Sequence, residues 1–102
     1  MPKMIASGCI RYRHYLITVH ALDRYIERIG GDAGDMITDI DNAWLFDPNQ
    51  SGQHRRNCAS AAIAERTGGY ALSNNRVMFI VIPEEHHVIV TTLSMSMEKR
   101  DA

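Results

Sequence analysis

The sequence predicts an α+β fold, with an N-terminal strand and two helices packed on a C-terminal antiparallel sheet of three to four strands. Two patterns predict it. Between residues 19 and 46, apolar residues recur with the spacing of amphipathic helices. After residue 69, short apolar runs bounded by turn residues are typical of strands. A chain of 102 residues is expected to fold as one domain, 1–102.

The N-terminal strand and the first helix are expected within residues 8–29. Residues 8–17 alternate polar and apolar side chains in part and contain strand-favouring tyrosine and isoleucine. Thr18 is a suitable N-cap, because its hydroxyl can accept a hydrogen bond from the first helical turn. Gly30 and Gly31 favour a helix end, so we predict a helix over 19–29.

A second helix is predicted over 33–46. Asp32 or Asp35 can cap its start, and Pro48 prevents it from continuing. Trp44 lies at helical spacing from the preceding apolar residues, and we interpret it as a core anchor.

The segments that flank the predicted sheet are polar or alanine-rich. Residues 48–57 are expected to form an exposed loop, because they combine Asn, Gln, Ser and Gly. Residues 58–66 are rich in alanine and predict a short helix. Residues 97–102 are expected to be a flexible tail.

The last third of the chain is expected to be β-structure. Strands are predicted at 70–73, 77–82 and 87–95. With 83–86 as the connecting loop, Ile80 lies opposite Ile89, and Val77 lies opposite Thr92. Both hairpin faces are then apolar at the centre. Because so short a chain has few helices to cover two faces, we expect a homodimer or a stable complex with another protein.

The charges are unevenly distributed, although the formal net charge is only −1. Residues 32–47 carry five aspartates and no basic residue, whereas arginines gather before and after them. Arginine greatly outnumbers lysine, and its planar fork fits phosphate and carboxylate groups. The bias therefore favours anion recognition. Arginine-rich genomic composition or internal ion pairs would also explain it.

The sequence also predicts the cellular compartment and the use of cofactors. No apolar run approaches the ~20 residues of a membrane helix, and no long apolar segment follows the N-terminal methionine. We therefore expect a cytoplasmic protein without a membrane span. Cys9 and Cys58 are far apart and are interpreted as buried thiols. No glycine-rich phosphate loop and no clustered metal ligands occur, so no cofactor and no metal site are predicted.

The most informative pattern lies in the first predicted helix, where His20, Arg24 and Arg28 recur every four residues. Side chains at this spacing stack along one side of a helix. The opposite, core-facing stripe consists of Leu22, Tyr25, Ile26 and Ile29. An imidazole beside two permanent cations suits a phosphate group. The same pattern also decorates ordinary solvated helices.

The order of these features resembles the RelE, colicin D and EndoU-like ribonuclease superfamily of toxin-type domains. The resemblance rests on Thr18-x-His20-Ala21-x-x-Arg24-x-x-x-Arg28 after a short strand, and on a C-terminal hairpin that ends Val-Ile-Val-Thr-Thr-Leu. It covers roughly residues 16–30 and 69–95. The second helix is more acidic, and the loop at 47–57 longer, than the family pattern.

The resemblance implies a metal-independent ribonuclease, or a silent relative that binds RNA. It implies active-site roles for His20, for Arg24 or Arg28, and for Thr91 or Thr92. In such chemistry an imidazole acts as acid or base, and a guanidinium stabilises the charge that develops on the phosphate. An antitoxin would then be an expected partner. Further contacts to RNA are predicted from basic positions elsewhere in the chain: His54, Arg55, Arg56, Arg66 and Arg76.

A second function class stays open beside the ribonuclease. The chain can instead be a phage- or bacterium-encoded inhibitor without enzymatic activity, which binds a host protein. It would use an apolar sheet face and the acidic second helix, with Asp35, Asp39 and Asp41 as the binding residues. The near-neutral net charge favours this class slightly, because many nucleases are strongly basic. His86 and His87, beside two glutamates, are interpreted as a solvated turn.

Overall fold

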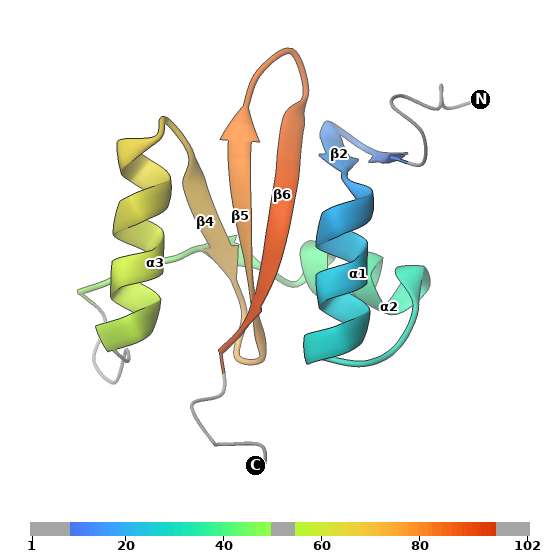
Figure 1. Ribbon diagram of the computed structural model, residues 1–102, viewed down its shortest axis with the longest axis horizontal. Helices are drawn as coiled ribbons and strands as arrows, with labels where there is room; N and C mark the ends of the chain where they lie inside the picture. Colours follow the sequence, from blue (N-terminus) through green and yellow to red (C-terminus); the bar gives the residue numbers. More distant parts are fainter. Residues whose placement is uncertain (1–8, 50–54, 96–102) are drawn as a thin grey trace.

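The computed structural model describes residues 9–49 and 55–95, and over these residues the chain is α+β, with three helices and one mixed six-stranded sheet (Figure 1). The elements are β1 (Ile10–Tyr12), β2 (Tyr15–Ile17), α1 (Val19–Arg28), α2 (Ala33–Asp41), β3 (Trp44–Leu45), α3 (Arg55–Arg66), β4 (Tyr70–Ser73), β5 (Val77–Pro83) and β6 (His87–Ser94). The strand order is β1-β2-β6-β5-β4-β3. The predicted fold class is confirmed, with more strands than expected.

The predicted N-terminal strand is in fact a tight hairpin of β1 and β2. Arg13 adopts the left-handed backbone conformation, with φ 57°, and lets the chain reverse between Tyr12 and Tyr15. β2 then pairs in parallel with the start of β6, with Tyr15 opposite His87. The sequence hid this turn, because neither Gly nor Asn marks it.

Helix α1 begins where the sequence predicts and is anchored to the sheet by its N-cap residue, Thr18. The Thr18 hydroxyl accepts a hydrogen bond from the Ala21 backbone N–H at 3.1 Å and donates one to the Ile89 carbonyl at 2.9 Å. Ala21 and Tyr25 form its buried stripe, and the helix lies along β6 (Figure 1). The N-cap therefore fixes both the start of the helix and its position against the strand.

Helix α2 is shorter than predicted. Its start has a reciprocal capping box, in which Asp32 and Asp35 each accept a hydrogen bond of 3.0 Å from the other's backbone N–H. The helix ends at Asp41, so the predicted end at residue 46 is wrong. Trp44 and Leu45 pair instead with β4 as an edge strand. Trp44 is 53% exposed and is not a core anchor.

Helix α3 is longer than predicted, because it begins at Arg55. The expected exposed loop at 48–57 is therefore wrong at its end, where Asn57 is buried in the first turn of the helix. Residues 50–54 and the expected tail at 97–102 lie outside the described residues. The helix ends before Gly68, whose φ of 88° favours glycine.

The core has two parts, one on each face of the sheet. Helices α1 and α2 cover the face that carries Val77, Phe79 and Val81, all fully buried. Helix α3 packs on the opposite face, against Ala71 and Met78. Both faces thus carry helices, although residues of β6 on the α3 side stay half-buried. Self-association stays a prediction. Within 9–49 and 55–95, no helix is both long and apolar enough to span a membrane.

The β5–β6 hairpin forms as predicted, but in a different register. The observed pairs are Ile80 with Thr91, Val81 with Ile89 and Val77 with Ser94, in place of the predicted Ile80 with Ile89 and Val77 with Thr92. A bulge accounts for much of the change, because Val90 has no residue opposite it. Beyond the bulge the side chains of β6 exchange faces, so Ile89 is buried on the side of α1.

A buried polar network joins α1, α2 and the turn between β4 and β5. The Tyr25 hydroxyl donates to the Asp39 carboxylate at 2.5 Å. Asn74 donates to the same carboxylate at 3.0 Å, and the Arg76 guanidinium lies 3.3 Å from it. Burial, and then the hydrogen bond to Asp39, raise the pKa of Tyr25 to about 12. The network therefore holds a neutral phenol against an acidic side chain in the core.

This raised pKa predicts a loss of stability in alkaline solution. The folded protein keeps the Tyr25 proton above the ordinary tyrosine pKa of 10.0, whereas the unfolded chain loses it. The contribution of Tyr25 to the free energy of unfolding is complete below pH 10 and is lost as the pH rises to about 12. Urea unfolding across this range should show stability falling less steeply in Tyr25→Phe than in wild type. Part of the fall should persist, because the pKa of Tyr70 is also raised to about 12. An equal slope in both proteins would contradict this prediction.

Candidate functional site

The polar side of α1 carries the three predicted residues His20, Arg24 and Arg28, here called the α1 flank. His20 is exposed, and its ring has no hydrogen-bond partner among the residues that the structure describes. The Arg24 guanidinium lies 2.8 Å from the Glu27 carboxylate, as an exposed ion pair. Such a pair contributes little to stability and exchanges readily for another anion.

Arg28 links the α1 flank to β6. Its guanidinium donates a hydrogen bond to the Thr92 carbonyl at 2.9 Å. β2 pairs only with the first residues of β6, up to Ile89, so α1 lies beside the rest of that strand (Figure 1). The contact anchors the Arg28 side chain while its other N–H donors remain available.

The threonines of β6 do not join the α1 flank. Thr92 is fully buried, and its hydroxyl donates to the Ala21 carbonyl at 2.9 Å. It therefore fastens α1 to the sheet and is closed to solvent. Thr91 lies opposite Ile80, on the other face of the sheet. The placement of Thr92 gives it a structural role.

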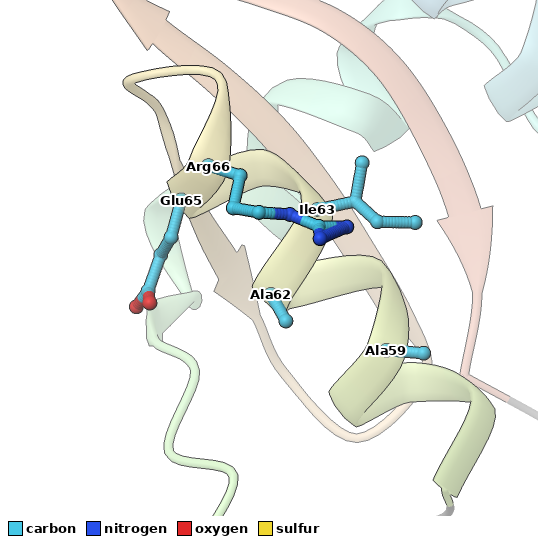
Figure 2. Close-up of a pocket in the computed structure, with 5 residues that line it drawn as sticks. All are labelled: Ala59, Ala62, Ile63, Glu65 and Arg66. Atoms are coloured by element: carbon cyan, nitrogen blue, oxygen red, sulfur yellow. The ribbon is translucent and has the colours of Figure 1, made fainter.

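Three of the other basic residues predicted to contact RNA lie on the far side of the sheet from α1. Arg55, Arg56 and Arg66 belong to α3, which packs on the opposite face of the sheet. Arg66 lines a shallow, open groove on the solvent side of α3, beside the exposed Ile63 (Figure 2). Arg76 pairs with Asp39 in the buried network, and His54 lies outside the described residues.

Each acidic residue predicted to bind a protein partner already has a partner within the chain. Asp35 belongs to the capping box of α2. Asp39 is buried and accepts the hydrogen bond from Tyr25. Asp41 is exposed, but its two oxygens each accept a hydrogen bond of 2.8 Å from the Tyr12 hydroxyl. The second helix therefore does not present these carboxylates as one open acidic face.

Sequence reasoning missed a group of four side chains, here called the Tyr–His cluster: His14, Tyr15, Tyr70 and His87. The Tyr70 hydroxyl lies 2.6 Å from Nδ1 of His87. The rings of His14 and His87 meet edge to face, with centroids 5.0 Å apart, and the His14 and Tyr15 rings are 4.1 Å apart. The cluster forms where β2, β4 and β6 begin, so no spacing in the sequence reveals it.

The tyrosines of the cluster are both held in their neutral form. Burial raises the pKa of Tyr70 to about 12, and the neighbouring Tyr15 adds to the effect. Burial also raises the pKa of Tyr15, while its hydrogen bond with Tyr70 opposes the rise. The Tyr70 hydroxyl oxygen can accept a hydrogen bond from Nδ1–H of His87 and so favours the tautomer that carries its proton on Nδ1 and leaves Nε2 unprotonated.

His86 lies in the turn that the sequence predicts, whereas the interpretation of His87 as part of a solvated turn is wrong. His87 is the first residue of β6 and is half-buried in the Tyr–His cluster, whereas His86 ends the preceding loop. Within the described parts of the chain, no three His, Cys, Asp or Glu residues are grouped closely enough to hold a metal ion.

Comparison with known proteins gives no relative for this chain. No family model, no curated protein and no solved structure matches it.

Proposed function

We infer that the chain binds single-stranded RNA and cleaves it without a metal ion. The observation that carries this proposal is the α1 flank, on which His20 and Arg24 remain open and Arg28 is anchored beside β6. Guanidinium groups bind phosphate with paired hydrogen bonds, and the imidazole of His20 adds a further hydrogen-bond donor. Successive phosphates of one RNA strand would lie along this flank.

RNA is favoured over a host protein as the ligand, because the acidic residues of α2 already make hydrogen bonds within the chain. An inhibitor that binds through α2 would need free carboxylates, but Asp35, Asp39 and Asp41 are occupied inside the chain. The α1 flank has no such constraint, because its ion pair to Glu27 is exposed. Phosphate can therefore replace Glu27 at low cost. The resemblance of the sequence to toxin-type ribonucleases supports the same function.

Binding to the α1 flank is tested by Arg24→Gln, which keeps a good helix former and removes the charge. We expect weaker binding of a fluorescent single-stranded RNA. The slope of log K against log salt should become shallower by ~0.7, as for one lost phosphate contact. Anisotropy titrations at several salt concentrations measure both quantities.

Arg66→Gln on α3 is the matched control, because it removes the same charge on the opposite face of the sheet. Its affinity and salt slope should equal those of wild type. A loss in Arg66→Gln with none in Arg24→Gln would move the RNA site to α3. A wild-type protein that neither binds nor cleaves RNA in the presence of a chelator would overturn the proposal in favour of a protein partner.

A further inference from the structure

The Tyr–His cluster has the composition of a proton-transfer site. It brings two imidazoles and two phenols together from three strands and the β1–β2 turn. His14 is exposed and His87 is half-buried, so the group is open to solvent at one side. We propose that His87, oriented by Tyr70, and His14 are the acid–base pair for RNA cleavage. This inference rests on the proposed function and assigns its catalytic residues.

The geometry orients His87 as a catalytic base requires. The Tyr70 hydroxyl oxygen lies 2.6 Å from Nδ1 and accepts a hydrogen bond from its N–H, which leaves Nε2 unprotonated and facing a substrate as the basic nitrogen. The ring is therefore held in one orientation by a third group, as in activated acid–base pairs. Tyr70 does not meet the reacting atoms and is a positioning residue.

The backbone holds the second imidazole in place beside the first. The His87 N–H donates to the His14 carbonyl at 2.9 Å, which ties the β1–β2 turn to the start of β6. The two rings stand nearly perpendicular, at 82°, with centroids 5.0 Å apart. A phosphodiester at the open side of the cluster can thus reach both imidazoles.

The reaction is an intramolecular transesterification and consumes no water. The ribose 2′-oxygen attacks the adjacent phosphorus and loses its proton to Nε2 of neutral His87. The bond between phosphorus and the 5′-oxygen breaks, and protonated His14 gives its proton to that oxygen. The products are a 2′,3′-cyclic phosphate and a free 5′-hydroxyl. Proton exchange with water then restores both imidazoles.

The α1 flank has a different part in this scheme. Within the described residues, no group orients the ring of His20. This imidazole is therefore suited to binding phosphate and not to acid–base catalysis. Substitutions in the α1 flank and in the Tyr–His cluster should therefore affect different kinetic constants. Changes in the α1 flank raise KM, and changes in the Tyr–His cluster lower kcat.

The test compares His87→Ala with His86→Ala, its immediate neighbour outside the cluster. Cleavage of a defined RNA oligonucleotide is followed by gel, in the presence of a chelator. We expect His87→Ala and His14→Ala to lower kcat by about 10²–10⁴-fold with little change in KM. His86→Ala should keep the wild-type kcat. Wild-type cleavage with unchanged kcat in both cluster variants would overturn the assignment and leave the proposed function standing.

Tyr70→Phe separates positioning from folding, because the ring remains and only the hydroxyl is lost. We expect kcat to fall about tenfold, as for one lost hydrogen bond. Nitrogen NMR of the His87 ring should show Nδ1–H dominant in wild type and a mixture of tautomers in Tyr70→Phe. An unchanged tautomer in Tyr70→Phe would overturn the orienting role of Tyr70. Absence of cleavage by the wild type would overturn both this assignment and the proposed function.

Discussion

Replacing Asp39 with alanine is expected to destabilise the fold by about 2–4 kcal/mol. The carboxylate accepts hydrogen bonds from Tyr25 and Asn74, and alanine would leave both donors without a partner. Tyr25 is fully buried, so water cannot replace the lost acceptor without opening the core. Arg76 contributes less, because its side chain is 58% exposed and can be rehydrated. Since the network joins three elements, its loss should also reduce cooperativity.

Urea denaturation, monitored by circular dichroism, measures the loss of stability in Asp39→Ala. Asp41→Ala is the matched control, because the residue lies on the same helix and accepts hydrogen bonds from Tyr12 but is itself exposed. Its cost should stay below about 1 kcal/mol. Equal losses in the two variants would mean that the buried network has no special role.

Gly69→Ala is expected to cost about 3 kcal/mol, through a steric conflict inside the sheet. A Cβ atom at this position would collide with the Val81 carbonyl oxygen, and it would approach Ile82 Cδ1 to 2.7 Å. The isoleucine tip can move aside, but the carbonyl belongs to the backbone of β5, which is paired on both sides. Either β4 would move away from β5, or the turn after α3 would deform.

Thermal or urea unfolding measures the loss, with Gly34→Ala as the control. Gly34 lies in the first turn of α2, where an added Cβ would meet only Asp32 Oδ1, at 3.3 Å. The gain of about 1 kcal/mol in helix propensity offsets this contact, so stability should change little. A Gly69→Ala protein as stable as Gly34→Ala would show that the backbone of β5 yields easily.

The local sequence determined the features that depend on neighbouring residues. Thr18 caps α1 as predicted. The cap needs only a hydroxyl three residues before the backbone N–H that donates a hydrogen bond to it. The apolar run at 77–82 forms a strand for a similar reason, since its side chains suit a sheet buried on both faces. The open α1 flank likewise follows from helical spacing. These parts of the fold and of the candidate site could be read from the chain.

Other features depend on pairings between distant parts of the chain. The backbone of Trp44 pairs with the edge of β4 instead of extending α2, and Ile89 faces α1 because a bulge at Val90 changes the register of β6. His87 meets Tyr15 because β2 lies parallel to β6, and it meets Tyr70 because β4 and β6 both pair with β5. Parallel pairing is set by the packing of the whole domain and leaves no local pattern. The sequence by itself thus determined the helix that carries His20, Arg24 and Arg28, whereas only the tertiary structure decided which imidazoles lie together, because that proximity arises from long-range strand order.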